Sequence, residues 1–182
     1  MKELSLHILD IVQNSLGAKA MLIKIDLVED LKKDLLLISI DDNGVGMDES
    51  VAKSVLDPFY TTRTTRKVGL GLPLLAQAAK GCGGDIDIQT KKGKGTIIKA
   101  SFGLSHIDRA PIGSMSDTMV TLIALNPEVD FVYRHCIADK EFILDTRIIK
   151  NTLQEVPINY PSVLDWIKNY VEDGIKELNG GA

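Results

Sequence analysis

The stretch DDNGVGM, residues Asp41 to Met47, follows the apolar run Leu35 to Ile40 and decides how the neighbouring sequence is interpreted. Asn-Gly after such a run is a common hairpin signal, because both residues tolerate a positive φ angle. A hairpin also needs a second strand directly after the turn, with apolar residues at every second position. Instead, Asp48 to Leu56 begins with a capping residue and an acidic turn, and its apolar residues have helical spacing. We therefore expect a strand, a loop and a helix, with the hairpin as the alternative.

The expected loop contains Gly44 and Gly46, directly after two carboxylates at the end of the strand. Glycine permits a positive φ angle, and the missing side chain lets a ligand approach the backbone closely. The same residues also occur in loops that only turn the chain. The loop alone therefore leaves two interpretations open, a ligand site and a simple turn.

The composition limits the kind of ligand and the compartment. With 182 residues, of which 45% are hydrophobic and 25% charged, the chain can bury a sizeable core. The net charge of −4 argues against nucleic acid or an anionic membrane as the main partner. No apolar run approaches membrane-spanning length, and the first residues do not resemble a signal peptide, so we expect a cytoplasmic protein. Cys82 and Cys136 lack CxxC spacing, which favours free thiols over a disulfide or a zinc site.

Residues Lys2 to Lys19 have the apolar periodicity of an amphipathic helix. On a neighbouring face, the polar side chains of His7, Asp10 and Asn14 recur at intervals of three and four residues, so they point into one space. A solvated polar stripe and a functional site both fit this spacing. For His7 the alternatives are an ordinary surface histidine and a residue that tunes Asp10.

Strands are expected at Met21 to Val28 and Leu35 to Ile40, and a polar, basic loop at Tyr60 to Lys67. This loop leads into Gly69-Leu70-Gly71-Leu72 and a helix from Pro73 to Lys80. A glycine-rich turn before a helix presents unpaired N–H groups and the positive end of the helix dipole, which suits a phosphate chain. A single GxG also occurs in many ordinary turns.

The order of these motifs resembles the GHKL ATPases, the group of gyrase, ninety-kilodalton chaperones, histidine kinases and mismatch-repair ATPases. The similarity covers about Leu4 to Phe102, and the stretch Pro58 to Arg63 is closest to short-lid sensor kinases of the nitrogen-regulatory type. Asp10-x-x-x-Asn14 resembles the N box of the family, and Asp42 to Gly46 its first glycine box. Asp57 to Phe59 resembles the F box, and Gly69 to Leu72 the second glycine box.

The resemblance implies an ATP site with bound Mg2+. It implies that Asp42 accepts a hydrogen bond from the adenine amino group, that Thr96 makes a second adenine contact, and that Asn14 holds Mg2+. A carboxylate also repels the carbonyl oxygen of guanine, so Asp42 favours ATP over GTP. The remaining residues implied to contact the nucleotide are Gly44, Gly46, Thr62, Arg63, Gly69, Leu70, Gly71 and Leu72. The basic loop around Arg63 has a bland alternative, a solvated charged loop.

Two departures bear on the reaction. Asp10, the implied catalytic residue, stands where ATP-hydrolysing members generally carry a longer Glu, which puts efficient hydrolysis in doubt. His7 is not followed by the acid and proline of a phosphoacceptor box, so we do not expect a complete sensor kinase. One hypothesis is a kinase that transfers the γ-phosphoryl group of ATP to a partner protein. The other is a non-catalytic ATP-dependent switch or slow ATPase that binds a partner.

Beyond Phe102 the resemblance ends. We expect a linker at Ser105 to Ser116, followed by strands and helices, with the last helix opened by a capping box at Ser162-x-x-Asp165. The expected strands are Thr118 to Leu125, Val129 to His135 and Glu141 to Leu144, and the first helix runs from Asp145-Thr146 to about Glu155. The apolar face of the last helix, with Trp166 beside it, is interpreted as core, with a docking or dimer surface as the alternative.

We predict an α/β sandwich of the α+β type: a mixed, largely antiparallel sheet covered on one side by helices, with a C-terminal extension of β-structure and two helices. Residues 1–104 form the expected ATP-binding domain, and residues 105–182 the extension, packed on it or continuing it. The expected ligands are ATP, ADP and Mg2+. The expected macromolecular partners are an unidentified protein and a second copy of the chain.

Overall fold

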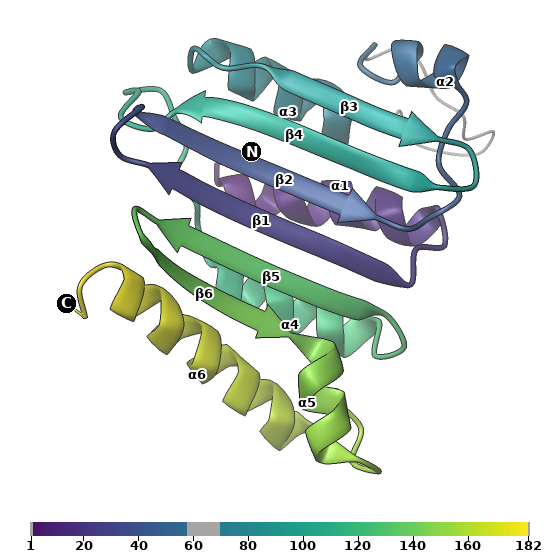
Figure 1. Ribbon diagram of the computed structural model, residues 1–182, viewed down its shortest axis with the longest axis vertical. Helices are drawn as coiled ribbons and strands as arrows, with labels where there is room; N and C mark the ends of the chain where they lie inside the picture. Colours follow the sequence, from purple (N-terminus) through teal and green to yellow (C-terminus); the bar gives the residue numbers. More distant parts are fainter. Residues whose placement is uncertain (1, 58–69, 182) are drawn as a thin grey trace.

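The computed structural model describes residues 2–57 and 70–181, which form a six-stranded sheet with the strand order β3-β4-β2-β1-β5-β6 (Figure 1). The pairing of β1 with β5 is parallel, and the other four pairings are antiparallel. The strands are β1 (Leu22–Asp30), β2 (Leu35–Asp42), β3 (Ile86–Lys91), β4 (Gly95–Gly103), β5 (Asp130–Ile137) and β6 (Lys140–Asp145). The mixed, largely antiparallel sheet expected from the sequence is therefore confirmed.

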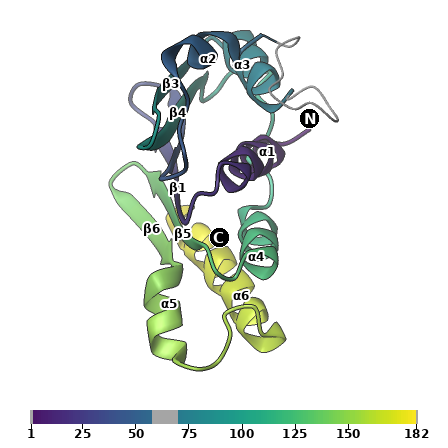
Figure 2. The same ribbon diagram turned by 90° about the vertical axis from the view of Figure 1, so that its right-hand side faces the viewer.

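The helices of the described chain are α1 (Leu4–Gly17), α2 (Glu49–Ser54), α3 (Gly71–Gly81), α4 (Met115–Leu125), α5 (Thr146–Leu153) and α6 (Pro161–Leu178). Figure 2 shows α1, α3, α4 and α6 on one side of the sheet. Ile23, Ile25 and Leu27 alternate along β1 and are fully buried, as the period of two in a half-covered sheet requires. The expected sandwich, with helices on one face, is confirmed.

The hairpin alternative for Asp41 to Met47 is wrong, because helix α2 follows the loop after β2. Asp48 takes the N-cap position of α2, but within the described chain its side chain makes no capping hydrogen bond. Instead its carboxylate lies 3.7 Å from the Lys92 ammonium group. The loop thus leads from the sheet into a short helix, as the spacing of apolar residues predicts.

The expected strand Thr118 to Leu125 is wrong, because these residues lie in helix α4. Ser114 caps this helix by accepting a hydrogen bond from the Asp117 N–H at 3.2 Å. The buried apolar residues Met115, Met119, Leu122 and Ile123 then follow at helical spacing. A short, continuously apolar segment rich in β-branched residues has no periodicity that separates a strand from a buried helix, so this segment alone does not predict the helix.

The remaining C-terminal elements agree with expectation except at the start of α6. Strands β5 and β6 form as predicted, and Asp145 caps α5 by accepting a hydrogen bond from the Arg147 N–H at 3.0 Å. The capping box at Ser162 is wrong, since the N-cap of α6 is Tyr160, two residues earlier, and Pro161 lies in the first turn. Proline suits this position because its fixed φ is helical and it needs no N–H acceptor.

Strand β5 continues the sheet that the first four strands begin, so the C-terminal part is joined to the rest by backbone pairing with β1. A buried polar chain reinforces this junction: the Tyr133 hydroxyl lies 2.9 Å from His135 Nδ1, and His135 Nε2 lies 2.7 Å from Glu29 Oε1. An ionised carboxylate only accepts, so Nε2 donates to Glu29 and Nδ1 of a neutral His135 accepts from Tyr133. Burial raises the pKa of Tyr133, which keeps this hydroxyl protonated.

The segment between β4 and α4 also contacts the start of the chain. The N–H groups of Leu4 and Ser5, in the first turn of α1, donate to the carbonyl oxygens of Pro111 and Ile112 at 2.9 and 2.7 Å. The expected linker is therefore a hydrogen-bonded part of the structure. Within the described ranges, no helix has both the length and the apolar character needed to cross a membrane.

Candidate functional site

Asp42 is the last residue of β2 and is only 5% exposed. Its Oδ2 accepts a hydrogen bond from the Ser15 hydroxyl of α1 at 2.6 Å, and its Oδ1 accepts one from the Gly44 N–H at 2.8 Å. These bonds fix the carboxylate between the sheet and α1. Each carboxylate oxygen has a further lone pair, so Asp42 can still accept a hydrogen bond from a ligand.

Thr96 lies directly opposite Asp42 in the pairing of β2 with β4, and it is also buried. Its hydroxyl is 2.9 Å from the hydroxyl of Thr90 on β3. Thr90 in turn accepts a hydrogen bond from the Met47 N–H, at 2.9 Å. The end of the sheet therefore carries a cluster of hydroxyl and carboxylate groups, buried except for the half-buried Thr90. We call it the Asp42 cluster: Ser15, Asp42, Thr90 and Thr96.

The loop after β2 is held tightly against its neighbours. Gly46 has a φ of +67°, and a Cβ there would overlap the carbonyl oxygen of Lys91. A Cβ on Gly44 would lie 2.8 Å from the carbonyl oxygen of Ala18. Both glycines are thus explained by close approach to the chain's own backbone. Their expected role in leaving room for a nucleotide stays a prediction.

A second part of the site lies where α3 meets α1. Asp10 and Asn14 are exposed on α1. A Cβ on Gly71, the first residue of α3, would lie 3.5 Å from Asp10 Cβ and 3.8 Å from Asn14 Nδ2. Leu70 at the N-cap supplies no side-chain hydrogen bond within the described chain. The positive end of the α3 dipole therefore lies beside a carboxylate and an amide. The helix end suits an anion, and the carboxylate and amide suit a cation bound to that anion.

Helix α1 joins the two parts, because Asn14 and Ser15 are consecutive residues with different faces. Asn14 belongs to the exposed stripe beside Gly71, and Ser15 is buried against Asp42. Residues that are distant in sequence, from α1, β2, β4 and α3, are thereby brought to one end of the sheet. The structure thus gathers the described candidates Asp10, Asn14, Asp42, Gly44, Gly46, Gly71 and Thr96 in one region.

The second glycine motif contributes two different leucines. Leu70 is 44% exposed, whereas Leu72 is 8% exposed and belongs to the hydrophobic core. Thr62, Arg63, Gly69 and the expected polar loop Tyr60 to Lys67 lie outside the described residues. The same holds for Pro58 and Phe59 of the F box.

The interpretation of His7 as a surface histidine is wrong, because the side chain is only 4% exposed. The neighbours of α1 come from far along the chain, from α3, α4 and the segment around Pro111, and sequence periodicity does not report them. Nδ1 of His7 has no hydrogen-bond partner among the described residues. Burial lowers the pKa of His7, so the imidazole is held in its neutral form.

Sequence reasoning missed Ser15 and Thr90, the two hydroxyl residues that complete the Asp42 cluster. A signal for Ser15 exists: it follows Ile8 and Ile11 at helical spacing and so falls on the apolar stripe of α1. A hydroxyl at such a position needs a buried partner. Thr90 carries no comparable signal, because its role depends on the pairing of β3 with β4.

The donor set beside Gly71 suits Mg2+ better than a metal held by the protein alone. Within the described ranges, no group of three or more His, Cys, Asp or Glu side chains could hold a metal ion. Mg2+ is usually bound by one or two protein oxygens together with phosphates and water. The side-chain amide of Asn14, which lies near the α3 N-terminus, carries one such oxygen.

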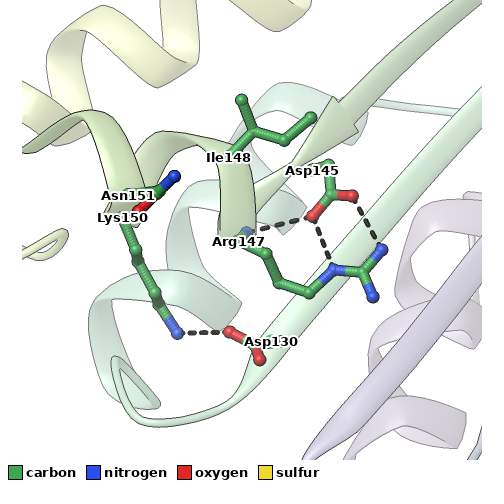
Figure 3. A pocket seen from close by; sticks show the side chains of 6 residues that line it. All are labelled: Asp130, Asp145, Arg147, Ile148, Lys150 and Asn151. Atoms are coloured by element: carbon green, nitrogen blue, oxygen red, sulfur yellow. Dashed lines mark hydrogen bonds and ion pairs between the residues drawn. The ribbon is translucent and has the colours of Figure 1, made fainter.

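A separate surface hollow of about 710 Å3 is formed by β5, β6 and α5 (Figure 3). Its charged residues neutralise one another: Lys150 Nζ lies 2.7 Å from Asp130 Oδ1, and Arg147 Nη2 lies 2.8 Å from Asp145 Oδ2. A ligand would have to displace these pairs, whereas Asp42 already presents a free lone pair. The Asp42 cluster is therefore the better candidate site.

A model of a known family covers more than half of the chain. The model of the family described as histidine kinase-, DNA gyrase B-, and HSP90-like ATPase matches residues 2–106. These residues include α1, the Asp42 cluster and α3. The match therefore contains every part of the candidate site.

Among curated proteins, the chain is 40% identical over 76 residues to a putative sensor protein of Shewanella frigidimarina. It is 39% identical over 70 residues to sporulation kinase E of Bacillus subtilis, and 43% identical over 58 residues to the signal transduction histidine-protein kinase AtoS of Escherichia coli. These matches cover 41%, 38% and 32% of this chain. They span only 12%, 9% and 9% of the relatives, so they concern one region of much longer proteins.

Two solved structures share the fold at low sequence identity. The N-terminal domain of a DNA repair protein has a TM-score of 0.57 and 17% identity, over 80% of this chain and 53% of that one. The Aquifex aeolicus MutL ATPase domain complexed with ADP has a TM-score of 0.51 and 16% identity, over 85% of this chain and 70% of that one. Both matches extend beyond the family region into the C-terminal part.

Proposed function

The chain belongs to the family of histidine kinase-, DNA gyrase B- and HSP90-like ATPases, and from this premise we propose that it binds Mg-ATP and transfers the γ-phosphoryl group to a residue of a partner protein. The observation that carries the proposal is the meeting at α1 of the Asp42 cluster and the N-terminus of α3. The similarity of this region to sensor kinases supports the choice of kinase chemistry.

The Asp42 cluster is assigned to adenine. The exocyclic amine of adenine is a hydrogen-bond donor, and the fixed carboxylate of Asp42 offers it a charged acceptor with little reorganisation. The buried Thr96 hydroxyl lies opposite on β4 and supplies a second polar contact. Guanine presents a carbonyl oxygen in place of the amine, and the carboxylate repels it.

The region around Gly71 is assigned to the phosphates. The N–H groups at the start of α3 and the positive end of its dipole attract the phosphate oxygens. We assign Asn14 to hold Mg2+, which when bound would neutralise charge on the phosphates. Thr62, Arg63 and Gly69 are assigned to the same phosphates by family resemblance.

In the transfer step, the bond from the γ-phosphorus to the β–γ bridging oxygen breaks and a bond from the acceptor atom to the γ-phosphorus forms. ADP leaves, and the acceptor loses a proton. For a hydroxyl acceptor, we assign the exposed carboxylate of Asp10 to take that proton. A histidine acceptor is itself a nucleophile and needs no strong base, so the short side chain of Asp10 is compatible with transfer to histidine.

A second function is favoured by the same short side chain. Asp10 reaches one methylene less far than Glu, which disfavours activation of a water molecule. The chain would then act as an ATP-dependent switch or slow ATPase, in which bound nucleotide controls affinity for a partner. In both proposals residues 1–104 bind the nucleotide, residues 105–182 contribute to partner binding, and the protein acts in the cytoplasm.

The two functions are separated by incubating the full chain and its co-purified partners with γ-labelled ATP, followed by mass spectrometry of the partners. Phosphoryl transfer predicts label on one partner residue, and none when Asn14→Ala replaces the wild type. A partner that binds in an ATP-dependent way and stays unmodified would support the switch instead. Binding of the chain to partners without any dependence on ATP would contradict both functions.

A further inference from the structure

Helix α6 presents two large aromatic side chains to solvent. Trp166 is 52% exposed and Tyr170 is 40% exposed, and their rings stack with centroids 5.0 Å apart and planes 9° apart. The buried side of α6 is formed by Val163, Ile167 and Val171. The aromatic pair lies on the flank of this side, where Tyr170 contacts β6 and Trp166 stacks on Tyr170.

The aromatic pair is held in place by β6, at the end of the sheet order. The Tyr170 ring lies 5.1 Å from the Phe142 ring, and its hydroxyl donates to the Ile143 carbonyl oxygen at 3.3 Å. Ile143 is itself 43% exposed. Rings fixed in this way lose little conformational freedom on binding, which favours their use in recognition.

Unpaired acidic groups extend this aromatic stripe along α6. Asp173 and Glu177 follow Tyr170 at helical spacing, so they share a face with Trp166 and Tyr170. Both are exposed, and neither makes a side-chain hydrogen bond or ion pair with the described part of the chain. We call Trp166, Tyr170, Asp173 and Glu177 the acidic aromatic stripe.

The stripe borders a hollow of about 460 Å3 between α6 and β6. Glu177 and Glu141 line it together with the ring of Phe142 and the side chain of Leu178, and Lys140 contributes one positive charge. The hollow can accept an apolar side chain beside the carboxylate of Glu177, whereas Glu141 is already paired with Arg134 at 2.9 Å. It lies on elements that take no part in the Asp42 cluster.

A second copy of the chain is a poor occupant for this surface. Two copies that met through this surface would bring the exposed carboxylates of Asp173 and Glu177 in one copy close to those of the other, and like charges repel. A positively charged occupant does not meet this repulsion.

We propose that the acidic aromatic stripe and the adjoining hollow bind a basic segment of a partner protein that carries alternating cationic and aliphatic side chains. Lysine or arginine of that segment pairs with Asp173 and Glu177 and lies over the aromatic faces of Trp166 and Tyr170. An aliphatic side chain enters the hollow against Phe142 and Leu178. This inference does not depend on ATP binding.

The test uses Trp166 as its own reporter, because it is the only tryptophan of the chain. Two synthetic twelve-residue peptides share the same valine and leucine positions, with lysine and arginine in one and glutamate in the other. Titration of the full chain with the basic peptide should shift Trp166 emission in a saturable way, and the glutamate peptide should not. The affinity for the basic peptide should fall at least about fivefold in the double variant Asp173→Asn, Glu177→Gln.

The matched control is the double variant Glu128→Gln, Asp108→Asn, which removes two exposed acids elsewhere and should bind the basic peptide as the wild type does. Equal responses to both peptides, or equal weakening in both double variants, would overturn the proposal. A shift of Trp166 emission when the chain is concentrated without peptide, with a dimer in sedimentation, would overturn it in favour of a second copy. Every outcome is read without nucleotide, so failure here leaves the kinase proposal standing.

Discussion

Replacing Asp42 with Asn changes the group assigned to adenine while keeping its size. In the wild type, both carboxylate oxygens accept protein hydrogen bonds, from Ser15 Oγ at 2.6 Å and from the Gly44 N–H at 2.8 Å. Asparagine keeps an oxygen for the Gly44 N–H, and its amide can donate to the Ser15 oxygen, since a hydroxyl both donates and accepts. The free energy of unfolding should therefore fall by only about 1 kcal/mol.

The effect on ATP should be much larger. A hydrogen bond to a charged group contributes about 1.5–3 kcal/mol, and its loss corresponds to a dissociation constant roughly 10–150-fold higher. The preference for ATP over GTP should also narrow, because an amide no longer repels the guanine carbonyl oxygen as a carboxylate does. Isothermal titration calorimetry with Mg-ATP and Mg-GTP measures both quantities.

Ser15→Ala is the control for this experiment. It removes one partner of Asp42 but leaves the carboxylate and its bond from Gly44, so we expect a loss of stability of about 1 kcal/mol and less than about fivefold weaker ATP binding. If Asp42→Asn binds Mg-ATP within about threefold of the wild type and remains folded, the adenine assignment is refuted. Thermal unfolding of each variant shows whether the fold is retained.

Four further substitutions test other parts of the account. Asp10→Asn should bind Mg-ATP within about threefold of the wild type yet lose about 10²–10⁴-fold in turnover, whereas Asn14→Ala should lose Mg-dependent binding. A phosphotransfer assay run beside a binding titration measures both effects, and unchanged turnover in Asp10→Asn would remove Asp10 from catalysis. Gly46→Ala adds a methyl group against the Lys91 carbonyl oxygen at a φ of +67°. The free energy of unfolding, measured with denaturant, should fall by about 1–3 kcal/mol. Unchanged stability would contradict the close packing of the loop. Burial lowers the pKa of His7 from its ordinary value of 6.5, so as the pH falls the unfolded chain takes up this proton before the folded chain does. The free energy of unfolding should therefore fall as the pH drops below about 6.5. In His7→Gln, the free energy of unfolding should depend on pH less strongly than in the wild type.

The sheet and most of its helices could be predicted because their local signals agree with their environment. Strand β1 alternates apolar and polar residues, β2 is a short apolar run, and α1 and α3 carry apolar stripes that match their buried faces. The order of the glycine and acidic motifs was sufficient to predict the family that the sequence comparison confirms. These elements needed no knowledge of distant neighbours.

The errors occur where distant neighbours decide. Helix α4 contains Met119, Leu122 and Ile123 in a run that is apolar on several sides, and its packing against α1 and α6 selects the helix. His7 is buried by elements that follow it by many residues. At the start of α6, Pro161 fixes the first turn and overrides the capping box suggested by Ser162.

The candidate site likewise combines residues that local sequence predicts with residues whose role depends on distant neighbours. Asp42 and Asp10 stand in recognisable motifs, whereas Thr90 joins Thr96 only through strand pairing. Ser15 was visible as a hydroxyl on an apolar stripe, but its partner Asp42 is supplied by β2. Single residues of a site can thus be predicted from their motifs, while the hydrogen bonds that position them depend on the assembled fold.

The account rests most directly on the claim that the Asp42 cluster binds adenine. Calorimetric titration of the wild-type chain with Mg-ATP and with Mg-GTP, under identical conditions, tests that claim in one measurement. The account predicts saturable, one-to-one binding of ATP at least about tenfold tighter than that of GTP, from the hydrogen bond that only adenine can donate. Equal affinities for the two nucleotides, or no saturable heat with ATP, would contradict it.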